Sequence, residues 1–149
     1  MSNILLFDFS GTLVNMRPPT LLIKRDVLER LSQKFKFGII TGGPRSETTN
    51  ILKKLNIYSL FDPQLIITKD DTFLRKPDPL LITSFLKKVD SKKAIYIGDR
   101  SKDLKLAKAA KIPFIYVGKA KYGKIQLGYN YDLVEQAVNK LLSSGDTNE

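Results

Sequence analysis

Short apolar runs alternate with longer amphipathic segments along the chain, and this alternation limits the fold more than any other feature. The runs "NILLFDF", "FGII", "QLIIT", "AIYIGD" and "PFIYVG" read as buried strands, because they are short and almost continuous in apolar residues. Helical spacing follows at about 20–34, 45–55, 78–89, 102–110 and 131–142. Strand and helix in turn predict a three-layer α/β sandwich, in which helices cover both faces of a mostly parallel, five-stranded sheet.

A single domain accounts for the chain, because 149 residues with 42% apolar content can bury a sizeable core. We expect the domain to span residues 1–143, with residues 144–149 of the polar end "SSGDTNE" as a frayed tail. The apolar runs are shorter than the roughly 20 residues that cross a bilayer, and the N-terminus lacks the pattern of a signal peptide. We therefore expect a cytoplasmic protein without a membrane partner.

The chain contains no cysteine and no histidine. This composition excludes disulfides, thiolate metal sites, and histidine as a general base or zinc ligand. Any catalysis must therefore use carboxylates, hydroxyls and amines.

Positive charge dominates, with 25 Lys and Arg residues against 15 Asp and Glu residues. Residues 100–124 hold eight of these cations and a single acid, Asp103. Such a stretch could steer a phosphorylated substrate or a polyanion toward a site. We favour an ordinary solvated surface, and nucleic acid is the less favoured partner because no run of exposed aromatic residues suggests base stacking.

Polar residues gather where the predicted strands end. In an open parallel sheet, ligands bind beyond the carboxyl ends of the strands. Taken singly, each of these residues has an ordinary explanation as a turn, a loop or a helix cap. Their joint arrangement at one edge of the sheet predicts a functional site. They are Asp8 and Ser10 after the first strand, Thr41, Gly42 and Gly43 after the second, Lys76 before the third helix, and Asp99 and Asp103 after the fourth strand.

With these residues in this order, the sequence resembles the haloacid dehalogenase superfamily of phosphotransferases over about residues 4–103. The family pattern D-x-D-G-T-L is similar to "DFSGTL", its hydroxyl motif to "IITGG", its lysine motif to "RKPDP" and its acidic motif to "GDRSKD". The resemblance implies a Rossmann-like fold and a Mg²⁺-dependent phosphatase or phosphotransferase that forms an aspartyl-phosphate. Its substrate would be a phosphorylated small molecule or macromolecule.

The resemblance also implies a role for each residue, and the chemistry of phosphate esters explains those roles. Phosphoryl oxygens repel a nucleophile, so a site must hold Mg²⁺ and other positive groups around them and present a nucleophile in line. The implied catalytic residues are Asp8, Ser10, Thr41 and Lys76. The implied substrate-binding residues are Thr41, Gly42, Gly43 and Lys76, and the implied metal ligands are Asp8, Ser10, Asp99 and Asp103.

Ser10 departs from the family pattern, in which an aspartate protonates the leaving group and then activates water. Serine does this poorly near neutral pH, so turnover could fall by about 10²–10⁴-fold. The backbone carbonyl of Ser10 can still bind metal, and some branches of the family carry a non-acid here. The alternative is a catalytically impaired binding protein for a phosphorylated or nucleic-acid partner.

The spacing of the motifs predicts that no cap domain is inserted. The intervals from Asp8 to Thr41 and from Thr41 to Lys76 each have room for one helix and one strand. The first also holds "VNMRPP", residues 14–19, which we expect to form a flap beside the nucleophile. An uncovered site would need a large substrate, or a second copy of the chain, to exclude water.

Overall fold

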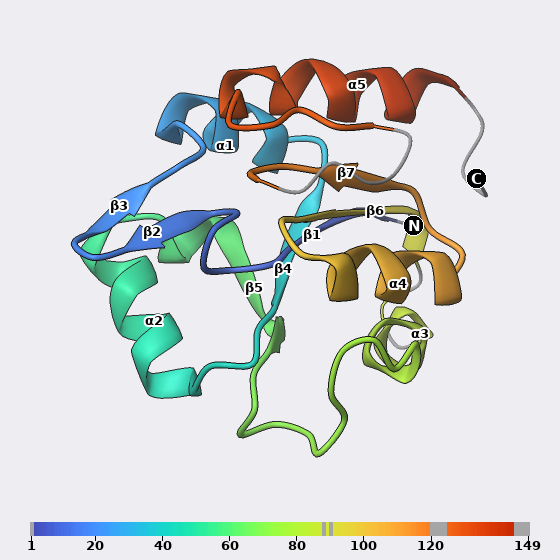
Figure 1. The fold of residues 1–149 in the computed structure, drawn as a ribbon, viewed down its shortest axis with the longest axis horizontal. Coiled ribbons are helices and arrows are strands. Elements are labelled where there is room, and N and C mark those ends of the chain that lie inside the picture. Colours follow the sequence, from blue (N-terminus) through green and yellow to red (C-terminus); the bar gives the residue numbers. More distant parts are fainter. Residues whose placement is uncertain (1, 88, 90, 120–124, 145–149) are drawn as a thin grey trace.

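A parallel five-stranded sheet forms the centre of the protein, in the order β5-β4-β1-β6-β7 (Figure 1). The computed structural model describes residues 2–87, 89, 91–119 and 125–144. The predicted fold class is confirmed. The strands are β1 (Ser2–Phe7), β4 (Lys36–Ile40), β5 (Phe61–Ile67), β6 (Ser91–Gly98) and β7 (Phe114–Tyr116), and the antiparallel hairpin of β2 (Val14–Met16) and β3 (Pro19–Leu21) lies outside this sheet.

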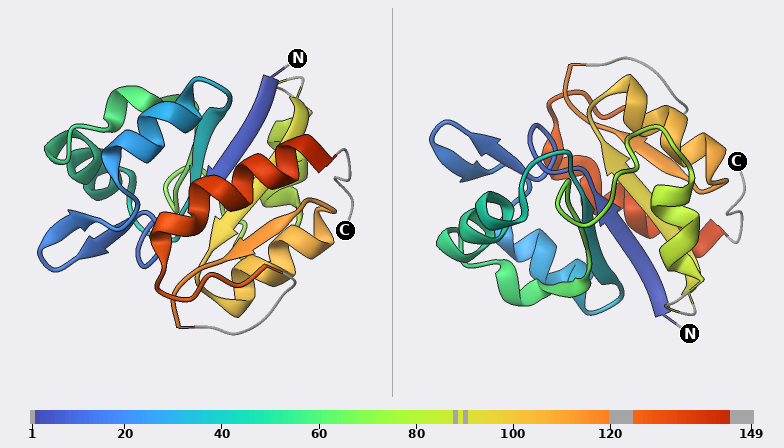
Figure 2. Two further views of the ribbon diagram at one scale, coloured as in Figure 1. Left: turned by 90° about the horizontal axis from the view of Figure 1, so that it is seen from above. Right: turned by 90° about the horizontal axis from the view of Figure 1, so that it is seen from below.

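Helices cover both faces of the sheet, as the alternating pattern predicts. Helices α1 (Arg25–Ser32) and α5 (Val134–Ser144) lie over one face, and α3 (Leu80–Leu86) and α4 (Ser101–Ala109) lie over the other (Figures 1 and 2). Helix α2 (Arg45–Lys54) packs Ile51 and Leu52 into the same apolar cluster as α1 and α5. Two short 3₁₀ turns, η1 (Tyr58–Leu60) and η2 (Tyr131–Leu133), complete the fold.

The central strand β1 shows why its sequence is an unbroken apolar run. Leu5 and Phe7 pack into the cluster with α1 and α5, whereas Ile4 and Leu6 pack into the cluster with α3 and α4. Side chains alternate between the two faces of a strand, so a strand covered on both faces must be apolar at every position. The first residue that breaks this run, Asp8, is thereby placed just beyond the edge of the sheet.

The helix predicted over 20–34 begins later, at Arg25, because the preceding residues pair in the hairpin. Val14 lies opposite Leu21, and the Leu22 N–H donates to the Leu13 carbonyl at 3.0 Å. The expected flap over 14–19 is part of this hairpin. The interval from β1 to α1 is thus filled by the hairpin, which is compatible with the prediction that a cap domain is missing.

The helix predicted over 78–89 spans Leu80–Leu86 in the structure. The residues before it form a turn instead, in which the Asp78 N–H donates to the Arg75 carbonyl at 2.9 Å. Residues 145–149 of the predicted tail lie outside the described residues, and Ser144 is the last residue of α5. Within the described ranges, every helix is too short or too polar to cross a membrane.

Candidate functional site

The predicted site residues meet at the carboxyl ends of β1, β4 and β6. Asp8 directly follows β1, and its N–H donates to the Ile97 carbonyl of β6 at 2.9 Å. Thr41 directly follows β4, and its N–H donates to the Ile67 carbonyl of β5 at 3.0 Å. Asp99 directly follows β6. Because these strands are neighbours in one parallel sheet, their ends bring residues that are far apart in sequence to one edge.

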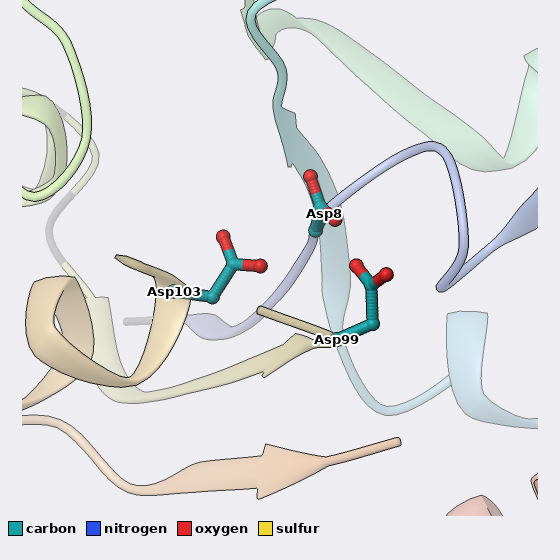
Figure 3. A group of neighbouring side chains, drawn as sticks. All are labelled: Asp8, Asp99 and Asp103. Carbon is teal, nitrogen blue, oxygen red and sulfur yellow. The ribbon is translucent and has the colours of Figure 1, made fainter. Parts of the chain in front are cut away.

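Three aspartates form the centre of the site. Asp8, Asp99 and Asp103 each place a carboxylate oxygen within 4.8 Å of the other two. Figure 3 shows the three carboxyl groups directed toward one space, from the end of β1, the end of β6 and the first turn of α4. The hydroxyl of Thr12 lies 3.1 Å from Asp99 Oδ1 and 3.4 Å from Asp8 Oδ2, so it stands between two of them.

Lys76, from the stretch between β5 and α3, forms ion pairs with two of these carboxylates. Its Nζ lies 2.7 Å from Asp8 Oδ1 and 2.7 Å from Asp103 Oδ1, and its side chain is 15% exposed. Burial lowers the pKa of Lys76, but the charges of Asp8 and Asp103 outweigh this effect and raise it. Lys76 is therefore a buried, charged ammonium group beside Asp8.

Burial raises the pKa of Asp8 to about 6, and the charge of Lys76 opposes this shift. A carboxyl group with this pKa is mostly ionised at pH 7. Burial and the charge of Asp8 also raise the pKa of Asp103. The two acids thus share one ammonium group in a poorly solvated space, a setting in which functional carboxylates are often found.

Asp103 and Asp99 differ in how many of their carboxylate oxygens already accept hydrogen bonds from the protein. Asp103 is fully buried; its Oδ1 accepts from the Tyr96 hydroxyl at 2.6 Å and lies beside Lys76. Its Oδ2 accepts from the Arg100 N–H at 3.2 Å. Asp99 is half-buried and contacts the Thr12 hydroxyl. Asp99 is therefore the more available of the two for an added ligand.

A cavity of about 400 Å³ opens over this cluster. Ser10 is exposed at its wall, and the Thr41 Oγ1 accepts from the Gly43 N–H at 3.1 Å within the loop after β4. The structure brings all eight predicted site residues together, although Asp99 lies in the aspartate cluster rather than in the cavity lining. The predicted residues that line the cavity are Asp8, Ser10, Thr41, Gly42, Gly43, Lys76 and Asp103.

Four residues at the site were not among the predicted ones. The Thr12 hydroxyl donates a hydrogen bond to Asp99, and the Tyr96 hydroxyl donates one to Asp103. The Tyr131 hydroxyl donates to the Gly11 carbonyl at 2.7 Å. Gly11 has φ +84°, and a Cβ there would lie 2.3 Å from Asp99 Oδ2. Only glycine combines this backbone angle with so close a contact. In the sequence, the signal for such a position is the glycine in "SGTL", shortly after the end of β1.

Gly11→Ala should lower the free energy of unfolding by about 1–3 kcal/mol, because a side chain at positive φ is strained and would push Asp99 away. Denaturant titration measures this change. Gly42→Ala is the matched control, since a Cβ at Gly42 meets nothing within 4 Å. Equal stability of the two variants would contradict the close packing of Gly11 against Asp99.

The family model described as haloacid dehalogenase-like hydrolase matches residues 23–117. The matched stretch contains Thr41, Lys76, Asp99 and Asp103 and begins after Asp8 and Ser10. Phosphoglycolate phosphatase of Escherichia coli K12 is 29% identical over 129 residues, which cover 78% of this chain and 47% of that enzyme. The chain thus spans about half the length of the curated relatives it matches.

Solved structures are similar over almost the whole chain. The core domain of a candidate phosphoglycolate phosphatase from Streptococcus pneumoniae is 26% identical, with a TM-score of 0.70, and the match covers 94% of this chain and 98% of that one. A candidate hydrolase of the same superfamily from Bacillus subtilis, solved bound to magnesium, has a TM-score of 0.75 at 14% identity, covering 93% and 99%. At that identity the second likeness concerns the fold alone.

Proposed function

The chain belongs to the haloacid dehalogenase-like hydrolases, and from this membership we propose that it is a Mg²⁺-dependent phosphatase or phosphotransferase acting through an aspartyl-phosphate at Asp8. One observation carries the proposal. Asp8 is a buried carboxylate at the floor of a cavity, ion-paired to Lys76 and grouped with two further aspartates. Its substrate is a phosphate monoester.

In the proposed reaction, a carboxylate oxygen of Asp8 attacks phosphorus while the ester oxygen leaves with its electron pair. The departing alkoxide takes a proton from water; a second water then attacks the phosphorus of the aspartyl-phosphate, its protons leave with inorganic phosphate or to solvent, and the Asp8 carboxylate is regenerated. In a phosphotransferase, a second alcohol takes the place of water. The first step explains why the nucleophile must be ionised, and the pKa of Asp8, at about 6, meets this need at neutral pH.

Lys76 and Thr41 support this reaction from two sides of Asp8. The ammonium group of Lys76, 2.7 Å from Asp8 Oδ1, would offset the negative charge that collects when a phosphate approaches a carboxylate. Thr41, at the cavity wall, would bind phosphoryl oxygens through its hydroxyl and the loop that follows. Such donors stabilise the transition state because the fold holds them in place beforehand.

The residues present fit a magnesium ion. Three carboxylates with oxygens within 4.8 Å of one another are the hard oxygen donors that Mg²⁺ prefers. Asp8, Asp99 and the backbone carbonyl of Ser10 would hold the ion directly, and Asp103 would hold it through water, because both of its oxygens already accept hydrogen bonds. When bound, Mg²⁺ neutralises charge on the phosphoryl oxygens.

Asp99→Ala should therefore lower the affinity for Mg²⁺ by about tenfold or more relative to the wild type. Asp103→Ala should lower it less. Isothermal titration with Mg²⁺ measures both affinities. Glu29→Ala, an exposed acid on α1, controls for the loss of one negative charge. Wild-type affinity in Asp99→Ala would remove this residue from the metal site.

The enzyme proposal is tested by measuring phosphate release from simple monoesters with and without Mg²⁺. We expect slow, Mg²⁺-dependent release. The alternative, a catalytically impaired protein that binds a phosphorylated partner, has one observation in its favour, namely Ser10 where a carboxylate would act as acid and base. Binding of a phosphate monoester without Mg²⁺ and without any turnover would favour this binding-protein alternative. A cytoplasmic location and a second copy of the chain covering the site remain predictions.

A further inference from the structure

Four cations that the proposed reaction does not use line the same cavity as Asp8. They come from three separate segments: the loop after β5, the stretch that precedes α3, and the start of α4. All four are exposed, and none of the ion pairs found in the described part of the chain involves them. They are Lys69, Arg75, Arg100 and Lys102, and we refer to them as the rim cations.

The rim cations flank the aspartate cluster on both sides. The strand order places β5 on one side of β1 and β6 on the other. Lys69 follows β5, and its N–H donates to the Gly43 carbonyl at 3.1 Å, which places its backbone beside the loop after Thr41. Arg100 lies on the β6 side, where its N–H donates to Asp103. A phosphoryl group at Asp8 would therefore have cations to either side of it.

Arg75 is held in position at the rim. Its Nη1 donates to the Thr72 carbonyl at 3.0 Å and to the Leu74 carbonyl at 2.9 Å. These bonds fix the guanidinium group, and within the described ranges its other N–H groups donate to no protein acceptor. A fixed guanidinium with unused donors is suited to a carboxylate or a phosphate, which it binds in a bidentate manner.

The cavity therefore holds more positive charge than one phosphoryl group needs. The acids in its lining are Asp8, Glu47 and Asp103, and Lys76 already pairs with two of them. A phosphoryl group at Asp8 is served by Lys76 and the proposed metal, which leaves Glu47 as the one remaining acid of the lining against the four rim cations. Two acids next to Lys69 in the sequence are engaged by Arg45: Asp71 pairs with its guanidinium group at 2.9 Å, and Asp70 accepts from its backbone N–H at 2.8 Å.

We infer that the substrate is a phosphate monoester whose leaving group carries a further anionic group, a carboxylate or a second phosphate, which the rim cations bind. The inference names the substrate class and rests on the proposed function for the reaction itself. Its structural basis is the placement of four cations without an ion pair, within the described residues, in the lining of the cavity that also holds Asp8. Its test uses binding, so it does not require turnover.

The test compares two ligands that cannot be hydrolysed and differ only in the far group, 3-phosphonopropionate and propylphosphonate. Isothermal titration in Mg²⁺ at low salt should show the carboxylate ligand binding at least about tenfold more tightly to the wild type. The quadruple variant Lys69→Gln, Arg75→Gln, Arg100→Gln and Lys102→Gln should reduce this preference to less than about threefold. Circular dichroism should show an unchanged fold, because all four side chains are exposed and lack ion pairs.

The matched control is Lys105→Gln with Lys108→Gln, two exposed lysines on α4 that do not line the cavity. This variant should keep the full preference. If the control variant loses as much of the preference for the carboxylate ligand as the quadruple variant does, the effect comes from the general charge of α4 and the inference is overturned. Equal affinity of the wild type for both ligands, or no binding of either, would overturn it as well.

These outcomes separate the inference from the proposed function. If the preference for the carboxylate ligand holds but no monoester is turned over, the rim cations bind an anion as inferred and the enzyme proposal fails. If phenyl phosphate is turned over in a Mg²⁺-dependent way but the preference is missing, the enzyme proposal stands and the inference fails.

Discussion

Asp8→Asn should abolish the turnover of phosphate monoesters, by about 10⁴-fold or more, and leave the fold intact. Asparagine has nearly the same shape as aspartate, and its amide oxygen can still accept a hydrogen bond from Lys76. The amide is not a nucleophile, so no phosphoryl intermediate can form. Steady-state kinetics measure the loss of activity, and denaturant titration should give a free energy of unfolding within about 1 kcal/mol of the wild type.

The control for Asp8→Asn is Asp132→Asn, which removes one negative charge at an exposed position whose ion-pair partner is Lys24. We expect it to retain wild-type kinetics. Unchanged turnover in Asp8→Asn would remove Asp8 from the mechanism, because no route through an aspartyl-phosphate at this position would remain.

Ser10→Asp should raise hydrolytic turnover by as much as about 10²–10⁴-fold, with the larger gain in the breakdown of the aspartyl-phosphate. The serine hydroxyl cannot take a proton from attacking water near neutral pH, so in the wild type the intermediate should persist. Ser10 is exposed at the cavity wall, which leaves space for a carboxylate. Single-turnover kinetics resolve the formation and the decay of the intermediate.

Ser10→Asn is the matched control, since it introduces a side chain of the same shape without a base. The decay of the intermediate should be fast in Ser10→Asp and slow in both Ser10→Asn and the wild type. Equal decay in all three would mean that another group activates water. If none of them is ever phosphorylated, the binding-protein alternative gains support.

The sheet could be predicted because its strands are buried on both faces. Ile4, Leu5, Leu6 and Phe7 are all fully buried, so the sequence of β1 carries its own signal. The hairpin of β2 and β3 was not predicted, because the apolar run that begins at Leu21 also fits a helix. Cross-strand pairing of residues 14–16 with residues 19–21 decides between the two structures.

The site was predictable where a strand end supplied the residue, as it did for Asp8, Thr41 and Asp99. Tyr96 was not, because it lies within an apolar run and its hydroxyl finds Asp103 only once α4 packs on the sheet. Thr12 contacts Asp99 across 87 positions of sequence, a distance that no local pattern encodes.

The rim cations illustrate the same limit. Arg100 and Lys102 belong to the basic stretch 100–124, of which residues 120–124 lie outside the described ranges. Lys69 follows β5 and Arg75 precedes α3, and they line the same cavity as Arg100 and Lys102 because β5 and β6 are strands of one parallel sheet and end at the same edge. Sequence shows that these residues are basic, and the order of the strands determines that they surround one cavity.

The most direct measurement of the central claim is the site of phosphorylation. The wild-type protein is incubated briefly with Mg²⁺ and a small phosphodonor such as acetyl phosphate, quenched in acid, digested and analysed by mass spectrometry. We expect one phosphoryl group, carried by Asp8, and we expect it to be missing in Asp8→Asn. Consumption of the donor with Asp8 unmodified at every time point, or a phosphoryl group on another residue, would contradict the account.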